Sequence, residues 1–141
     1  MIAGFKIIEE GAFADFEFEA RAESVEELFA VCGKAVFEAM TDLSKIELKE
    51  TIKFEVEGAS LEDLLFAFLA ELIYLKDVKK IFFREFNVEI EGSYKLKCAA
   101  KGESIDRGKH DLRTDVKAVT YHKLKVAKND CGFNAHVILD L

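Results

Sequence analysis

The sequence LEDLLFAFLAELIYL, residues 61–75, contains an unbroken apolar run from Leu64 to Ala70. Ser60 precedes this segment and Asp63 stands three positions after it, which is the spacing of a capping box at the start of a helix. The segment is too short and too acidic for a membrane span, which needs about 20 apolar residues. Because a helix that is apolar nearly all round is a buried helix, the segment predicts a central helix covered on more than one side.

Working outward, Ser24 begins another capping box, and apolar residues at helical spacing predict a helix that ends near residues 41–42. Elsewhere apolar and polar residues alternate, as they do in strands with one buried face. The predicted strands cover residues 5–8, 13–20, 52–56, 86–90, 94–100, 116–126 and 133–139. The order ββαβαββββ predicts a single α+β domain over 1–141, with a mixed or antiparallel sheet packed on two helices.

The composition excludes several classes of protein. A chain of 141 residues has the length of one domain, and a net charge of −7 argues against a general nucleic-acid binder. The cysteines are Cys32, Cys98 and Cys131, an odd number without a CxxC motif, so we expect reduced thiols. The N-terminus lacks the long apolar region of a signal peptide, and we therefore expect a cytoplasmic protein.

The sequence has no phosphate-binding loop, zinc-protease motif or nucleophile elbow, and we find no catalytic constellation. Two carboxylates stand out. Asp15 lies in a predicted strand, and Asp140 is followed by the terminal Leu141. Together with a terminal or main-chain oxygen they would form an all-oxygen site suited to Ca²⁺ or Mg²⁺ rather than zinc. A charged strand face at Asp15 and a frayed end at Asp140 are the alternatives.

The histidines and one lysine complete the candidates. His110 lies in a charged loop and His136 on the polar side of the last strand, so we expect both in solvent. His122 shares its strand parity with Val116, which favours a hydrogen-bonded histidine on the buried face. Lys117 either guards a strand edge against aggregation or contacts a phosphate or carboxylate.

The segment DVKAVTYH, residues 115–122, with the preceding Lys109-His110, resembles the most distinctive stretch of the archease family. Further similarities are MTDL at 40–43, FLAELIYL at 68–75 and the ending VILDL at 137–141. These motifs span the chain in the family's order, and the KAVTYH and VILD pieces are specific together. One motif departs: where the family has His-Thr-Ala-Asp, residues 12–15 read Ala-Phe-Ala-Asp, which keeps only the Ala-Asp part.

The resemblance implies a non-enzymatic protein cofactor of a tRNA-splicing RNA ligase. That ligase joins a 2′,3′-cyclic or 3′-phosphate end to a 5′-hydroxyl through a guanylylated histidine, using GTP and a divalent metal. The cofactor promotes guanylylation and allows multiple turnover. The family's metal ligands correspond to Asp15, Asp140 and an oxygen of Leu141, with Ca²⁺ expected ahead of Mg²⁺ or Mn²⁺.

The same resemblance assigns the remaining positions. Lys117 would activate the ligase, while Thr120 and His122 would orient the acidic cluster or serve the fold. The expected partner is the RNA ligase, with indirect or transient RNA contact and no membrane. The alternatives are a stand-alone metal-dependent phosphatase or hydrolase at the acidic site and a chaperone-like module that binds through exposed Phe residues. Only the hydrolase would turn over GTP or cyclic-phosphate RNA by itself.

Overall fold

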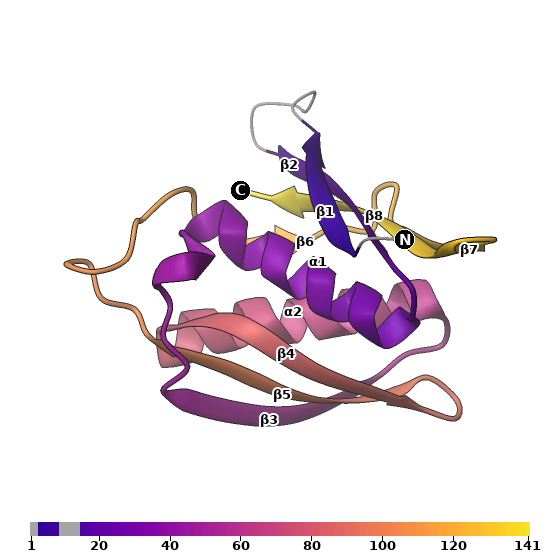
Figure 1. Cartoon of the computed structure of the whole chain (residues 1–141), viewed down its shortest axis with the longest axis horizontal. Helices are drawn as coiled ribbons and strands as arrows, with labels where there is room; N and C mark the ends of the chain where they lie inside the picture. Colours follow the sequence, from indigo (N-terminus) through magenta and orange to yellow (C-terminus); the bar gives the residue numbers. More distant parts are fainter. Residues whose placement is uncertain (1–2, 9–14) are drawn as a thin grey trace.

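A computed structural model describes residues 3–8 and 15–141 of the chain and places two helices between two sheets (Figure 1). The elements, in chain order, are β1 (Gly4–Ile8), β2 (Asp15–Ala22), α1 (Val25–Met40), the short 3₁₀ helix η1 (Leu43–Lys45), β3 (Glu50–Glu57), α2 (Leu61–Lys79), β4 (Ile81–Glu91), β5 (Lys95–Ser104), β6 (Ala118–Val119), β7 (Lys125–Asn129) and β8 (Gly132–Asp140). The predicted α+β class is confirmed.

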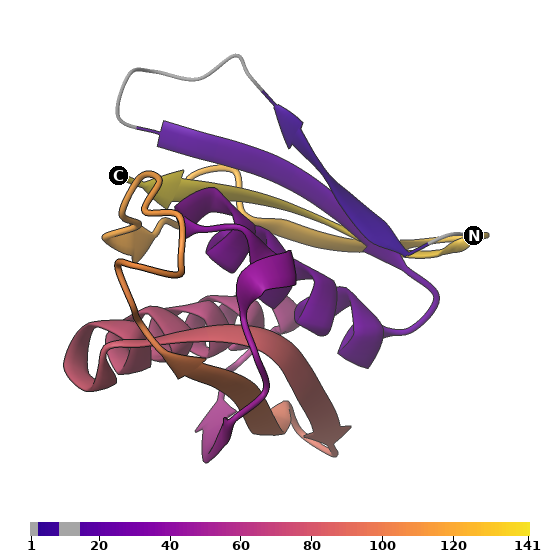
Figure 2. The ribbon, with the colours of Figure 1, turned by 60° about the vertical axis from the view of Figure 1, so that its left-hand side comes forward.

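The sheets form the outer layers of the molecule (Figure 2). The larger sheet has the order β1-β2-β8-β6, with β7 pairing to β8, and the smaller sheet has the order β3-β5-β4. All the strand pairs of the described residues are antiparallel. The strands predicted for one sheet therefore divide into two, because each side of the helical layer needs its own apolar cover.

Helix α1 begins and ends where its sequence predicts. The Ser24 hydroxyl accepts a hydrogen bond of 3.1 Å from the Glu27 amide, which satisfies one of the free donors of the first turn. The helix ends at Met40, and the amide of Thr41 donates to the carbonyl of Phe37 at 2.9 Å. Phe37 contacts aromatic rings of β4, with centroids 5.6 to 6.4 Å away, so α1 is fixed against the smaller sheet.

Helix α2 is the predicted central helix. The Ser60 hydroxyl caps it by accepting from the Asp63 amide at 3.1 Å. Phe68 contacts Phe29 of α1 and Phe54 of β3, which confirms that the helix is covered on more than one side. In the part of the chain that the structure describes, no helix is long and apolar enough to cross a membrane.

The segment 116–126 departs from its prediction. Only Ala118–Val119 pairs with β8 at this point, and the chain then turns at residues 122–123 before β7 begins. Lys123 adopts a left-handed backbone with φ 56°, which breaks the strand. Five strands instead of four therefore follow α2. Residues 12–14, where the family motif departs and part of a strand was predicted, lie outside the described residues.

Candidate functional site

Asp15 and Asp140 face each other across two neighbouring strands. Asp15 begins β2, Asp140 ends β8, and the register makes them direct partners. Cross-strand partners share a face of the sheet; the next pair along, Phe16 and Leu139, packs against the core, so the two aspartates lie on the outer face. Like charges directly opposite one another repel, and a bound cation would relieve that repulsion.

The chemistry of this pair fits a hard cation. Both carboxylates are half-buried, and half-buried Leu141 follows directly. Oxygen donors of this kind, completed by water, are those that Ca²⁺ and Mg²⁺ use. Among residues 3–8 and 15–141, no group of three or more His, Cys, Asp or Glu residues could hold a metal ion. In this part of the chain the pair offers two carboxylates, so further ligands of a cation would have to be main-chain oxygens or water.

The segment that carries Lys117 is fastened to the edge of β8. The Lys117 amide donates to the carbonyl of Asp140 at 2.9 Å. The amide and hydroxyl of Thr120 both donate to the carbonyl of Ile138, at 3.1 and 3.0 Å. The exposed side chain of Lys117 is therefore carried by the strand edge that ends at the aspartate pair.

Buried Lys76 of α2 fixes the same segment from the other side. The residue is only 4 % exposed, and its Nζ donates to Asp115 Oδ1 at 2.7 Å and to the carbonyl of Val116 at 3.2 Å. It also forms an ion pair of 2.6 Å with Asp77. A helical lysine normally lies in solvent, and for that reason Lys76 was not among the predicted residues. The sequence nevertheless held a signal for its burial: Lys76 stands four residues after Leu72 and therefore lies on the same, buried side of the helix.

The expectation for His122 is wrong with respect to burial. Its strand parity assumed a continuous strand from Val116, but the chain turns at this residue and its side chain is exposed. Thr120, by contrast, is half-buried and bonded to β8. Of the two, Thr120 therefore holds the segment in place, while the turn puts His122 in solvent.

His110, expected in solvent, is buried beside Glu103. Its Nδ1 accepts a hydrogen bond of 3.0 Å from the Asp106 amide, so the ring proton lies on Nε2, which donates to Glu103 at 3.0 Å. Burial disfavours the ionised form of Glu103 and by itself would raise its pKa. Hydrogen bonds from the Glu47 amide, Lys109 and His110 stabilise the carboxylate more strongly, and they lower the pKa of Glu103 to about 2. This network closes the long loop after β5, and its charged residues alone gave no sign of burial.

His136 is half-buried instead of lying free on the surface. Its Nδ1 lies 2.8 Å from the carbonyl oxygen of Lys123, and its Nε2 faces the carboxylate of Glu17. The histidine thereby ties the turn after β6 to the outer face of β2.

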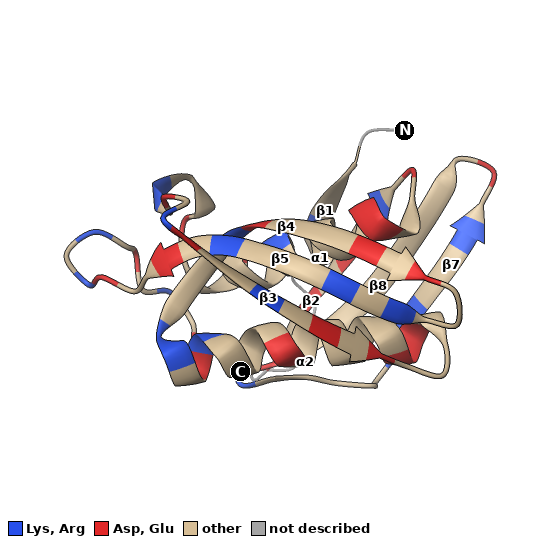
Figure 3. Cartoon of the chain, turned by 90° about the horizontal axis from the view of Figure 1, so that it is seen from below, with Lys and Arg blue, Asp and Glu red and all other residues tan. Residues whose placement is uncertain are grey.

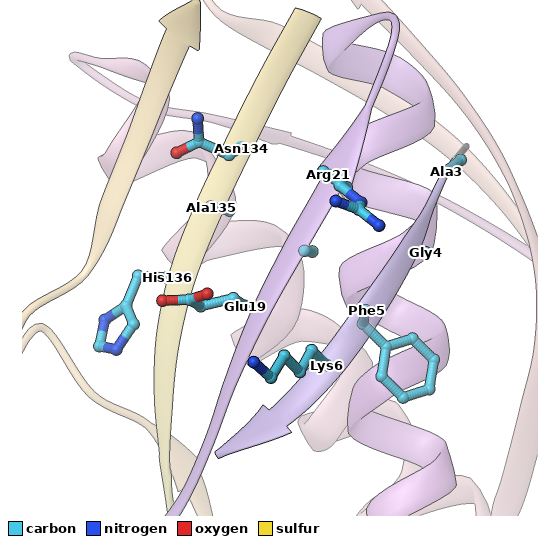
Figure 4. Close-up of a pocket in the computed structure, with 10 residues that line it drawn as sticks. Ala3, Gly4, Phe5, Lys6, Glu19, Arg21, Asn134, Ala135 and His136 are labelled. Carbon is cyan, nitrogen blue, oxygen red and sulfur yellow. The ribbon is translucent and has the colours of Figure 1, made fainter. Parts of the chain in front are cut away.

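A hollow of about 330 Å³ lies on the outer face of the larger sheet (Figure 4). Its polar side chains come from β1, β2 and β8 and are Lys6, Glu19, Arg21, Asn134 and His136. Among the described residues that line it there is no serine, threonine or cysteine. Its residues also lie farther along the β2–β8 ladder than the aspartate pair, so the hollow and the pair are separate features.

Comparisons with known proteins point in one direction. Residues 5–141 match the model of the archease protein family (MTH1598/TM1083). A protein archease of Pyrococcus abyssi is 42% identical over 118 residues, covering 82% of this chain and 83% of its own length. One from Methanopyrus kandleri is 35% identical over 131 residues, covering 91% of this chain and 94% of its own length.

Solved structures agree with this similarity. The solution structure of protein 1598 of Methanobacterium thermoautotrophicum superimposes with a TM-score of 0.84 at 35% identity, covering 98% of this chain and 99% of the other. The crystal structure of a Thermotoga maritima protein, described as an archease and possible chaperone, gives 0.63 at 25% identity, covering 96% of each chain.

Proposed function

This chain belongs to the archease family, and from that premise we propose that it is a non-enzymatic activator of a GTP-dependent tRNA-splicing RNA ligase. The observation that carries the proposal is the edge formed by Asp15, Asp140 and Lys117. The strand ladder pairs the two acids, and the backbone of the lysine is bonded to one of them. A solvent-facing edge of this kind suits presentation to a partner better than turnover of an enclosed substrate.

In the proposed mechanism, the residues that would hold a divalent cation, Ca²⁺ ahead of Mg²⁺ or Mn²⁺, are Asp15 and Asp140 through their carboxylates and Leu141 through an oxygen. When bound, the ion neutralises phosphate charge, which is the main requirement of phosphoryl transfer. Lys117 adds a mobile positive charge at the same edge and contacts the ligase or its nucleotide. Attack on GTP is left to the histidine of the ligase, and this chain promotes guanylylation and repeated turnover.

The direct test adds the protein in substoichiometric amounts to the RNA ligase of the same organism. We expect more guanylylated ligase and more ligations per ligase molecule, and no turnover of GTP or cyclic-phosphate RNA by the protein alone. Hydrolysis by the isolated protein would instead support a metal-dependent phosphatase at the aspartate pair. A ligase that responds equally to bovine serum albumin would reject the proposal and favour a general chaperone-like module.

Lys117→Ala is the sharpest single variant for this function. The side chain of Lys117 is exposed, and the bond to β8 is made by the backbone amide, which the substitution keeps. The free energy of unfolding should therefore change by less than about 0.5 kcal/mol. The maximal guanylylation rate of the ligase should nevertheless fall by at least about tenfold, a loss of about 1.4 kcal/mol of activation. Lys125→Ala, on β7, is the matched exposed control. Full activation by folded Lys117→Ala protein would reject a role of this lysine in activation, and its charge would then serve only to protect the strand edge against aggregation.

A further inference from the structure

One face of α2 is apolar, half-buried at two alanines and open to solvent at Tyr74 and Val78. Ala67, Ala70, Tyr74 and Val78 lie on one side of the helix, because residues three and four positions apart are neighbours on a helix surface. Tyr74 and Val78 are 57 % and 58 % exposed, although the opposite side of the same helix lies in the core. We name these four residues the α2 face.

An exposed aromatic ring extends this face. Tyr121, 58 % exposed, stacks on Phe66 of α2 with ring centroids 3.9 Å apart and an interplanar angle of 6°. Desolvation and the neighbouring Asp63 carboxylate raise the pKa of Tyr121 above its ordinary value. The stack holds an aromatic surface in place beside the helix, and such rigid aromatic groups are enriched where proteins bind one another.

The α2 face is continuous with the edge that carries Lys117. Tyr121, four residues after Lys117, stacks on Phe66 of α2 beside this face, whereas Lys76, which bonds to the residues just before Lys117, lies on the buried side of the helix. The chain between these two points therefore runs along α2. Figure 3, seen from below, places the C-terminus and α2 at the same edge of the view, and Figure 1 shows the C-terminus at the level of the larger sheet, above α2. A partner that reached Lys117 and the aspartate pair would meet the α2 face as well.

The rim of the α2 face is acidic. Asp63 lies beside Tyr121, Glu71 lies at the middle of the helix, and Asp77, exposed, adjoins Val78. A complementary partner therefore presents apolar side chains bordered by lysine or arginine. Enzymes that bind RNA carry such basic borders because they neutralise phosphates. A second copy of this chain would bring a matching acidic rim and a net charge of −7, and the two rims would repel.

We propose that the α2 face with Tyr121 is the docking surface that seats the RNA ligase, while Lys117 and the aspartate pair act on the ligase's active site. This inference rests on the proposed function. The two adjacent surfaces have different roles. The α2 face determines the affinity for the ligase, and the Lys117 edge determines the maximal rate of guanylylation.

The test measures guanylylation of the ligase against the concentration of Tyr74→Arg and Val78→Arg variants. For each variant, the concentration that gives half-maximal activation should rise at least about tenfold, with the same maximum at saturation. Lys117→Ala should show the reverse pattern. Leu48→Arg is the matched control, because Leu48 is 45 % exposed and precedes the smaller sheet. Unchanged half-maximal concentrations for both arginine variants would overturn the docking surface.

The acidic rim gives a second measurement. Glu71→Lys should weaken binding of the ligase and flatten its dependence on salt, because one attractive charge pair becomes repulsive. Glu89→Lys on β4 makes the same charge change on an exposed strand residue and should have no effect. Equal losses for Glu71→Lys and Glu89→Lys would show that only net charge matters and would reject the specific rim.

Direct binding to immobilised ligase without GTP separates this inference from the proposed function. Wild-type binding that depends on Tyr74, without activation, would keep the surface and reject the activator. Activation by a Tyr74→Arg protein that binds like wild type would do the opposite, and wild-type protein that neither binds nor activates would reject both. Sedimentation of the protein alone should show a monomer, and a dimer abolished by Tyr74→Arg would assign the surface to a second copy.

Discussion

At the scale of single residues, Glu103 shows how a loop without regular structure is held. Its carboxylate accepts from the Glu47 amide at 2.7 Å, from Lys109 at 2.8 and 3.0 Å, and from buried His110. These bonds connect the start of β3 with the loop after β5. Charge-assisted bonds to a buried carboxylate are stronger than neutral ones, so this residue is a good probe of the loop's stability.

Glu103→Gln should lower the free energy of unfolding at neutral pH by roughly 1–3 kcal/mol, because the bonds lose their charge. The pKa of Glu103 in the folded protein is about 2, against an ordinary value of 4.5. The advantage of wild type should therefore be complete above about pH 4.5 and disappear as the pH falls towards 2. Urea unfolding of both proteins across this range measures it, with Glu89→Gln as the exposed control. A difference independent of pH would show that Glu103 contributes through packing alone.

Lys76→Met should remove the clamp on the segment before Lys117 while filling nearly the same space. We expect a cost of about 1–3 kcal/mol, because the carbonyl of buried Val116 loses its donor while exposed Asp115 is rehydrated. Hydrogen exchange at the Lys117 amide should accelerate, and maximal activation of the ligase should fall severalfold. Lys79→Met, in the exposed last turn of α2, is the control. Unchanged exchange at Lys117 would mean that β8 alone holds the segment.

The histidines show why single residues resist prediction. His110 was expected in solvent and is buried, whereas His122 was expected on a buried face and is exposed. In both cases the deciding contact is distant or irregular. His110 depends on a glutamate of β5, and His122 on a turn that ends a two-residue strand. Strand parity carries information only while the strand continues.

At the scale of secondary-structure elements, the helices could be predicted because their signals are local. Ser24 and Ser60 cap the two helices as their spacing indicated, and the apolar run of α2 is buried. The pairing of β2 with β8 could not be predicted, because it joins residues as distant in the sequence as 15 and 140 and no local pattern specifies it. Spacing could nominate the two aspartates, and only the register shows that they face each other.

Asp140→Asn should affect this strand pair in two opposite ways. Without metal, removing one of two facing charges should leave the free energy of unfolding unchanged or raise it by about 0.2–1 kcal/mol. With Ca²⁺, the wild-type melting temperature should rise with ion concentration, by the equivalent of about 2.7 kcal/mol at 100 times the dissociation constant. The variant should lose this rise. Thermal melts after chelation and calorimetry with Ca²⁺ measure both effects.

Glu19→Gln serves as the control for Asp140→Asn, because it removes a charge from the same face of β2 away from the aspartate pair. Equal Ca²⁺ affinity of Asp140→Asn and wild type would remove Asp140 from the site and end the metal proposal. Equal losses for both variants would indicate diffuse attraction of cations to an acidic strand.

At the scale of the whole molecule, the two sheets differ in how far apart their strands lie in the sequence. The smaller sheet and both helices use residues 25–104, whereas the larger sheet joins strands from the two ends of the chain. Contacts between distant residues form slowly, because loop closure must precede them. The larger sheet should therefore complete after the helices have packed on the smaller one.

Refolding kinetics test this order. The chain contains no proline, so refolding from urea should lack the phase of tens of seconds that prolyl isomerases accelerate. Pulsed hydrogen exchange should protect amides of α1 and β4 before those of β2 and β8. Simultaneous protection in all four elements would indicate a single cooperative step. A slow phase that grows with time spent unfolded would require another source, such as transient association.

The position of β8 also matters during synthesis. Among the strands of the described residues it is translated last, and without it the pair formed by β1 and β2 is not joined to β6 and β7. A nascent chain can pack its helices and smaller sheet on the ribosome, but the aspartate pair does not exist until the codon for Asp140 has been read. Any chain cut short by stalling or premature termination before β8 would leave the ribosome with its helical layer uncovered and without its aspartate pair, and quality-control proteases could recognise it by that exposed layer.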